Sequence, residues 1–282
     1  MKKNLFKAAL AFMVVATAVF VSCKKDKKEE SVSSDNVTTE SNSSQSEFDD
    51  MLKISEDAMS DQSQINKISN TNSCVTVTAT TGMITLDYGT ACVGSDLRTR
   101  SGKLIITYTG KYRDPGTVVT ITTNNYFVNG KKIDGMRKVT NNGTNTAGNL
   151  VYSVVDSDVN GTANGYATIT DVDLKTTTWR SSRTREFAAG ASTPLNLLDD
   201  EYLINGSADG MTKEGMAYSM TATNIRIKIA CWASRIFYPV SGILSITATD
   251  GTRSIDYGNG DCDRTIQYTH TNGKTYTFTL AY

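Results

Sequence analysis

The sequence contains a single histidine, His270, and its five cysteines do not occur in short-spaced pairs. A site with several histidine ligands is therefore excluded, and the cysteine spacing is not that of a zinc site. A nucleophile–histidine triad would have to be built on His270, which lies beside the Asn272-Gly273 turn, and no Gly-x-Ser-x-Gly motif is present. The sequence offers no support for a catalytic triad.

The chain also has no excess of positive charge, because 29 lysines and arginines are matched by 29 aspartates and glutamates. A nucleic-acid-binding protein would show a clustered basic face, and the folded part has no such cluster. Proline is scarce, with three residues, and no stretch alternates between helical and strand patterns. These features disfavour a nucleic-acid partner and disfavour α/β folds.

The amino terminus has the pattern of an export signal. Residues 1–7 are basic, and residues 8–21 form an uncharged apolar run that is too short for a membrane-spanning helix. The following Phe20-Val21-Ser22-Cys23 resembles the lipobox of bacterial lipoproteins, in which the cysteine is lipidated and becomes the new amino terminus. We expect residues 1–22 to be a lipoprotein signal peptide, with an ordinary secretory signal as the alternative.

Residues 23–46 are rich in Lys, Glu, Ser, Asn and Thr and poor in apolar side chains, which predicts a flexible tether. Within this segment, Lys28-Glu29-Glu30 resembles the signals that send Bacteroidetes lipoproteins to the outer face of the outer membrane. A mixed-charge spacer is the simpler interpretation of the same run. We expect a lipid-anchored protein of the outer membrane, with surface exposure as the alternative to a periplasmic face.

Four cysteines remain after Cys23, and an even number in an exported chain indicates two disulfides. Folding a hairpin about Thr81-Gly82 brings Cys74 close to Cys92, and the second pair is then Cys231–Cys262. The alternative is four free buried thiols, because cysteine is also a good small core residue.

The part of the chain that should fold begins with a helical pattern. Ser46-Glu-Phe-Asp49 has the form of a capping box, and apolar residues then recur at helical spacing to about residue 61. We expect a short amphipathic helix and a linker in residues 47–70. Its acidic residues make packing on the domain a better prediction than contact with lipid.

Residues 71–282 alternate between strand-like runs and turns, many of them Asn-Gly or Asp-Gly. A hairpin unit ending in Asp-Tyr-Gly and followed by a cysteine occurs twice, at Asp87 and at Asp256. Two Tyr-x-x-Asn-Gly units, starting at Tyr126 and Tyr202, lie between them, so the order is mirrored rather than tandem. We predict an all-β fold, a long antiparallel meander of two related halves that forms a curled sheet or a sandwich.

The Asp-Tyr-Gly/Cys units, together with Tyr108-Thr-Gly-Lys-Tyr-Arg-Asp-Pro-Gly116 and Trp179-Arg-Ser-Ser-Arg-Thr-Arg185, resemble a group of uncharacterised Bacteroidetes lipoproteins. The resemblance covers nearly all of the chain from Cys74 to Tyr282. It implies a lipid-anchored envelope protein and no particular activity.

One strand carries a candidate binding surface. Trp179, Arg183, Arg185 and Phe187 fall on one face at period two, where aromatic and guanidinium groups could bind a sugar or an anionic polymer. The alternative is packing beneath long arginine stems, and the direction of this face decides between the two.

Oxygen-bearing side chains gather at Asp256, Asn259, Asp261 and Asp263, around two glycines, as a calcium site would require. The first hairpin unit keeps only Asp87 of this pattern, and the same residues are common in ordinary turns. We therefore predict no cofactor, with calcium as the alternative.

The sequence thus favours a non-catalytic surface module that binds a glycan, a peptide or an envelope protein. One alternative is a periplasm-facing carrier or assembly lipoprotein with an apolar cavity. Another is a carboxylate-dependent glycan hydrolase built on the loop residues Asp199, Asp200 and Glu201.

Overall fold

A computed structural model of the protein describes residues 36–60, 74–193 and 196–280. The signal peptide, Cys23 and most of the predicted tether and linker lie outside the described residues. Within them, no helix combines the length and apolar character needed to span a membrane.

Sixteen antiparallel strands form one continuous sheet. In its first half the strands are β1 (Thr76–Thr80), β2 (Met83–Asp87), β3 (Cys92–Val93), β4 (Thr99–Tyr108), β5 (Val118–Val128), β6 (Lys131–Asp134), β7 (Met136–Thr144) and β8 (Leu150–Ser157). The second half contains β9 (Ala167–Thr170), β10 (Thr176–Ala189), β11 (Glu201–Met211), β12 (Ala217–Lys228), β13 (Ser241–Ala248), β14 (Gly251–Asn259), β15 (Thr265–Thr269) and β16 (Thr275–Thr279). Two short 3₁₀ helices, η1 (Leu197–Asp199) and η2 (Ile229–Ser234), lie in the connections of the second half.

The strands follow one another across the sheet except at its centre. There the long strand β5 pairs with β6 over one part of its length and with β7 over the other. The long strand β10 pairs in the same way with β9 and with β8. The predicted antiparallel meander is confirmed, and of the two predicted forms the structure has the curled sheet.

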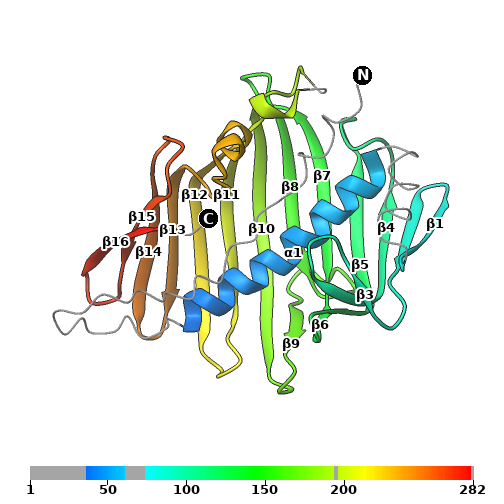
Figure 1. Cartoon of the computed structure of the whole chain (residues 1–282), viewed down its shortest axis with the longest axis horizontal. Coiled ribbons are helices and arrows are strands. Elements are labelled where there is room, and N and C mark those ends of the chain that lie inside the picture. Colours follow the sequence, from blue (N-terminus) through cyan, green and yellow to red (C-terminus); the bar gives the residue numbers. More distant parts are fainter. Residues whose placement is uncertain (1–35, 61–73, 194–195, 281–282) are drawn as a thin grey trace.

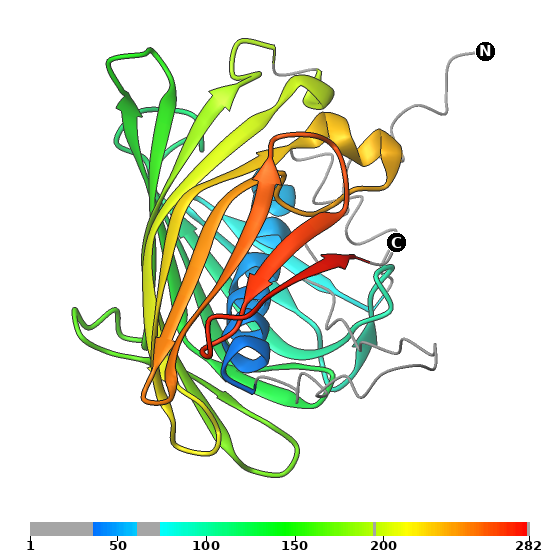
Figure 2. The same ribbon diagram turned by 90° about the vertical axis from the view of Figure 1, so that its left-hand side faces the viewer.

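The sheet is strongly curled, and the helix α1 (Asn36–Ser60) lies diagonally across its concave face (Figures 1 and 2). In Figure 1 the first turns of α1 lie by β11 and β12, and its last turns lie toward β7 and β4, so the helix crosses the sheet from one side to the other. The helix and the inward side chains of the strands share one hydrophobic core, to which α1 contributes Val37, Phe48, Met51, Leu52 and Ala58.

The helix begins earlier than the sequence pattern predicts. The prediction placed its start near Ser46 and assigned residues 23–46 to a tether, but Asn36 to Ser46 is already helical. Serine, threonine and asparagine are poor helix formers in isolation. Here Val37, Ser41 and Ser44 are buried against the sheet, so tertiary packing stabilises turns that local propensity disfavours.

Gly135, between β6 and β7, shows how closely α1 approaches the sheet. A Cβ atom at this position would lie 2.6 Å from the Cβ of Ala167 and 2.8 Å from Cζ of Phe48. The ring of Phe48 therefore packs directly against the backbone at the break between β6 and β7.

Both predicted disulfides are confirmed. Cys74 is bonded to Cys92, which joins the start of the sheet to β3, and Cys231 of η2 is bonded to Cys262 in the β14–β15 connection. Each bridge closes a loop near one end of the sheet.

Candidate functional site

The concave face carries five arginines that lie beneath or beside α1, and we call it the arginine face. Its members are Arg98, Arg100, Arg137, Arg183 and Arg185. They come from β4, β7, β10 and the turn before β4. Both β7 and β10 pair with β8, which lies between them in the sheet. Four of the five form ion pairs with acidic residues of α1.

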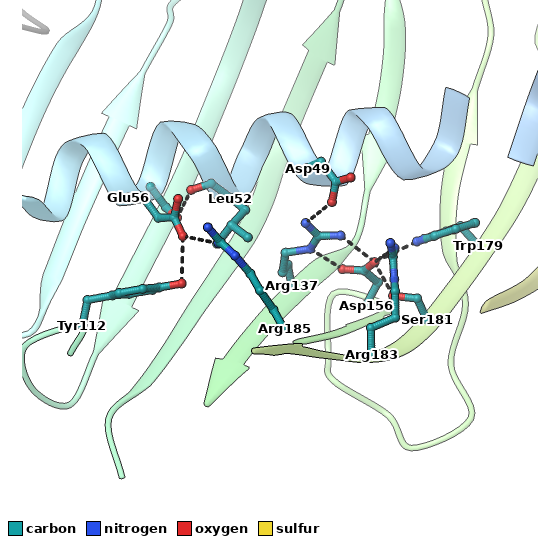
Figure 3. Close-up of polar contacts among 11 residues, drawn as sticks. Asp49, Leu52, Glu56, Tyr112, Arg137, Asp156, Trp179, Ser181, Arg183 and Arg185 are labelled. Atoms are coloured by element: carbon teal, nitrogen blue, oxygen red, sulfur yellow. Dashed lines mark hydrogen bonds and ion pairs between the residues drawn. The ribbon is translucent and has the colours of Figure 1, made fainter. Parts of the chain in front are cut away.

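Arg137 is the centre of the arginine face (Figure 3). Its Nε and Nη2 donate to the two carboxylate oxygens of Asp156 on β8, at 2.6 and 2.9 Å. Its Nη1 donates to Asp49 of α1 at 2.7 Å. Arg137 and Asp156 are both fully buried. The sheet supplies two of the three carboxylate oxygens that accept from Arg137, and the helix supplies the third.

Asp156 also accepts two hydrogen bonds from β10. The Trp179 indole N–H lies 2.9 Å and the Ser181 hydroxyl 2.6 Å from its Oδ2 (Figure 3). Burial alone would raise the pKa of Asp156, but attraction to Arg137 and these hydrogen bonds outweigh it, so the pKa lies below its usual value. Asp156 is therefore a fixed negative charge within the core.

Arg183 is the least satisfied member of the arginine face. Its Nη2 lies 3.7 Å from Asp156, and its guanidinium lies 5.5 Å from the ring centre of Trp179. Its Nε is buried without a hydrogen-bond partner in the described structure. Burial lowers the pKa of Arg183 below that of an ordinary arginine.

A second contact lies near the carboxyl end of α1. Glu56 accepts hydrogen bonds from Arg185 at 2.7 Å and from the Tyr112 hydroxyl at 2.8 Å (Figure 3). The Arg185 guanidinium also stacks over the ring of Tyr202, at 4.1 Å from its centre. One carboxylate of the helix thus joins two separate parts of the sheet.

A third contact lies at β4. Arg98 forms ion pairs with Glu47 and with Asp50, the latter at 3.2 Å. Arg100 reaches Asp50 at 2.8 Å and Asp96 at 2.6 Å. Burial raises the pKa of Glu47, and Arg98 only partly opposes this effect.

Arg183 lines two small pockets between α1 and the sheet. Their volumes are about 40 and 50 Å³, which is room for a few water molecules. Neither is large enough for a lipid chain while α1 is in place, so a carrier that used this part of the concave face would require α1 to move.

The structure brings together the predicted strand residues. Trp179 and Arg183 are buried beneath α1, and Arg185 is bonded to Glu56. Phe187 stacks on Tyr202 further along, with ring centres 4.8 Å apart. This face therefore points toward α1 rather than to solvent.

The proposed calcium residues form turns. Asp256 accepts the Gly258 N–H at 2.9 Å, and Asp263 accepts the Thr265 N–H at 2.8 Å. Asn259 and Asp261 bond each other at 2.9 and 3.2 Å. Over the described residues, no three His, Cys, Asp or Glu side chains gather as metal ligands would.

The acidic loop residues considered for hydrolysis each contact a different group. Asp199 accepts a hydrogen bond from Thr193 at 2.7 Å, Asp200 from Tyr202 at 3.1 Å, and Glu201 pairs with Arg226 at 2.7 Å. Burial raises the pKa of Asp200. The three carboxylates do not hydrogen-bond a common group.

Neither Arg137 nor Asp156 was predicted from the sequence, and the acidic residues of the helix were noted there without their arginine partners. One signal was available, because Arg137 and Asp156 each occupy a buried position two residues from a buried valine of the same strand, Val139 and Val154. A charged residue at such a position must be paired inside the core.

Comparison with known proteins adds no relative: no family model, no curated protein and no solved structure matches this chain.

Proposed function

We propose that the protein is a lipid-anchored, non-catalytic interaction module of the bacterial outer membrane, whose arginine face binds an acidic amphipathic helix. In the conformation described here that helix is α1. The observation that carries the proposal is the charge complementarity between the arginine face and α1, in which Glu47, Asp49, Asp50 and Glu56 each pair with an arginine.

The cellular location is supported by the sequence and is consistent with the cysteine chemistry. The apolar signal and the lipobox-like Phe20-Val21-Ser22-Cys23 support lipidation at Cys23. The two disulfides suit an oxidising compartment such as the periplasm or the cell surface.

Buried ion pairs favour recognition more than stability. Removing two charges from water offsets most of what their attraction contributes, so an apolar helix would be held at least as firmly. An arginine-lined face instead discriminates in favour of helices with carboxylates at matching positions, because any other helix would leave buried arginines unpaired.

The helix itself depends on this face. The first eleven residues of α1 are dominated by Ser, Thr and Asn, and an isolated helix of this composition is unstable in water. Folding of α1 is therefore coupled to its docking, as in segments that fold on binding. A helix with these properties can be exchanged for another of the same chemistry.

A labelled peptide with the sequence of residues 36–60 tests the proposal. The attached α1 competes at an effective concentration on the order of millimolar, so we expect weak peptide binding to the wild-type protein. Replacing Phe48 by alanine in the full chain should loosen α1 and raise the peptide affinity about tenfold or more. Fluorescence anisotropy measures both.

The matched control is the same peptide with Glu47, Asp49 and Glu56 replaced by Gln, Asn and Gln. It should bind the loosened protein much more weakly than the acidic peptide. If the Phe48→Ala protein does not fold, the double variant Asp49→Asn/Glu56→Gln serves in its place. Equal binding of the two peptides, or binding of neither, would contradict the proposal.

A further inference from the structure

Five hairpins of the sheet have the same turn. In each, the first residue donates its N–H to the carbonyl of the fifth, and the fourth residue donates its N–H to the carbonyl of the first. The fourth residue has a positive φ angle in every case. This turn is normally completed by glycine. The five segments are residues 94–98, 145–149, 171–175, 212–216 and 270–274.

Glycine occupies the fourth position in three of these turns, at Gly148, Gly215 and Gly273. The other two have leucine, with φ angles of 63° at Leu97 and 64° at Leu174. These leucines are 84% and 83% exposed. A large apolar residue is thus placed twice where both the backbone and the solvent disfavour it.

The two leucine turns lie at the same edge of the sheet. The Asn129-Gly130 turn links them, because Asn129 bonds the backbone of Thr99 next to the first leucine turn, at 2.8 and 2.9 Å. On its other side, Val172 of the second leucine turn lies 3.0 Å from the position that a Cβ on Gly130 would occupy. We call residues 94–98, 129–130, 171–175 and 212–216 the lower rim (Figure 1).

Val172 adds to the apolar surface of the lower rim, since it is 73% exposed. Most charged residues of the rim have a partner of opposite charge. Within the rim, Lys175 pairs with Glu214 at 3.5 Å and Lys213 with Asp171 at 3.9 Å, and beside it Lys132 pairs with Asp134 at 2.7 Å. The lower rim therefore exposes apolar side chains on a surface that carries little net charge.

The amino terminus of α1 lies at this same rim. Glu40, in its first turns, accepts the Lys213 N–H of the β11–β12 turn at 2.7 Å. Residues 24–35 are all that separates Asn36 from the lipidation site Cys23. Even fully extended, that length of chain spans no more than about 45 Å. The lipid anchor is thus attached to the edge of the domain that carries the exposed leucines.

We propose that the lower rim contacts the lipid surface, with Leu97, Val172 and Leu174 entering the interfacial region of the membrane that holds the Cys23 lipid. Burial of these side chains in lipid recovers the free energy that their exposure in water costs. Because the rim is nearly neutral, the contact should depend little on salt. This inference rests on the lipid anchor of the proposed function.

Fluorescence quenching in vesicles tests the inference. The lipidated full chain is reconstituted in vesicles of phosphatidylethanolamine and phosphatidylglycerol that contain nitroxide-labelled lipids. A fluorophore is attached to Asp173→Cys at the rim or to Ala147→Cys in the glycine turn at the opposite edge. We expect several-fold stronger quenching at position 173 than at position 147.

The double variant Leu97→Gly/Leu174→Gly supplies the matched control, because glycine keeps the geometry of both turns. It should reduce quenching at position 173 to the level found at position 147, while the protein still floats with the vesicles. If the wild-type protein floats but is quenched equally at both positions, the membrane contact of the lower rim is overturned and the lipid anchor is not. A label shielded in intact envelopes but not on vesicles would assign the rim to a protein partner and also overturn it. Failure of the wild-type protein to float would instead contradict the lipid anchor.

Discussion

Asp156 is a buried carboxylate that contacts four other side chains. Its carboxylate accepts hydrogen bonds from Arg137, Trp179 and Ser181 and lies close to Arg183. Two buried arginines therefore depend on one buried acid of the sheet.

Replacing Asp156 by asparagine should lower the free energy of unfolding at pH 7 by about 3 kcal/mol or more, because Arg137 loses its charged partner. The pKa of Asp156 is lower in the folded state than in the unfolded state. The contribution of Asp156 to the free energy of unfolding is therefore fully present above about pH 4, the pKa of an aspartate in the unfolded chain. It is lost as the pH falls through the lower pKa that Asp156 has in the folded protein. Urea unfolding from pH 7 to pH 3 measures both effects.

Asp49→Asn is the comparison for Asp156→Asn. Asp49 is 20% exposed and Arg137 keeps Asp156 in its absence, so the loss should be smaller. The role of Asp156 would be contradicted if both substitutions lowered the free energy of unfolding equally. It would also be contradicted if the loss of stability between pH 7 and pH 3 were the same in Asp156→Asn as in the wild-type protein.

Substituting an exposed leucine of the lower rim should increase stability, in contrast to the substitutions of Asp156 and Asp49. Leu174→Gly should raise the free energy of unfolding by about 0.5–1 kcal/mol, because a positive φ angle disfavours leucine by more than glycine loses in chain entropy. Gly215→Leu, in the same turn type with no atom within 4 Å of the added Cβ, should lower it by a similar amount. Thermal unfolding compares the two, and a loss of stability in Leu174→Gly would contradict the strain argument.

For single residues, some contacts could be predicted from the sequence and others could not. The cysteine pairs could be predicted, because a hairpin brings Cys74 to Cys92 through local turn chemistry. The environment of Arg183 could not, because period-two spacing shows that Trp179 and Arg183 share a face without showing what covers it.

At the level of elements, Phe48 is a main apolar contact between α1 and the concave face of the sheet. Its ring packs on Gly135 and is fully buried. Phe48→Ala should lower the free energy of unfolding, measured by urea titration, by about 3–5 kcal/mol through the cavity that it leaves. Val93→Ala, at a 60% exposed position, should change it little. Similar effects from the two would argue that α1 adds nothing to the core.

The existence of α1 was predictable and its start was not. From Phe48 onward the apolar residues recur at helical spacing, which is a strong signal. Before Ser46 the pattern depends on small polar residues such as Ser41 and Ser44, which are buried only because the sheet lies against them. No local rule assigns buried positions to serines.

On the scale of the whole molecule, the two disulfides hold the ends of an open sheet. The bonded cysteines are 18 and 31 positions apart in the sequence, and closing loops of this size stabilises the folded state by about 3 kcal/mol each, because it constrains the unfolded chain. Reduction should therefore lower the melting temperature by many degrees, which calorimetry with and without reductant measures. An unchanged melting temperature after complete reduction would contradict this view.

The all-β class and the antiparallel order could be predicted for the whole molecule from turn dipeptides and strand periodicity. The curl of the sheet and the ion pairs between α1 and four arginines distant in sequence could not. They depend on the cumulative twist of sixteen strands, which no local pattern specifies.

The central claim is that α1 is a separable occupant of the arginine face rather than a fixed part of the core. Native-state hydrogen exchange tests this most directly. We predict that the amides of α1 exchange through a local opening whose free energy lies well below that of global unfolding. The amides of β10 and β11 should exchange only with global unfolding. If the amides of α1 were as strongly protected as those of β10, the claim would be contradicted.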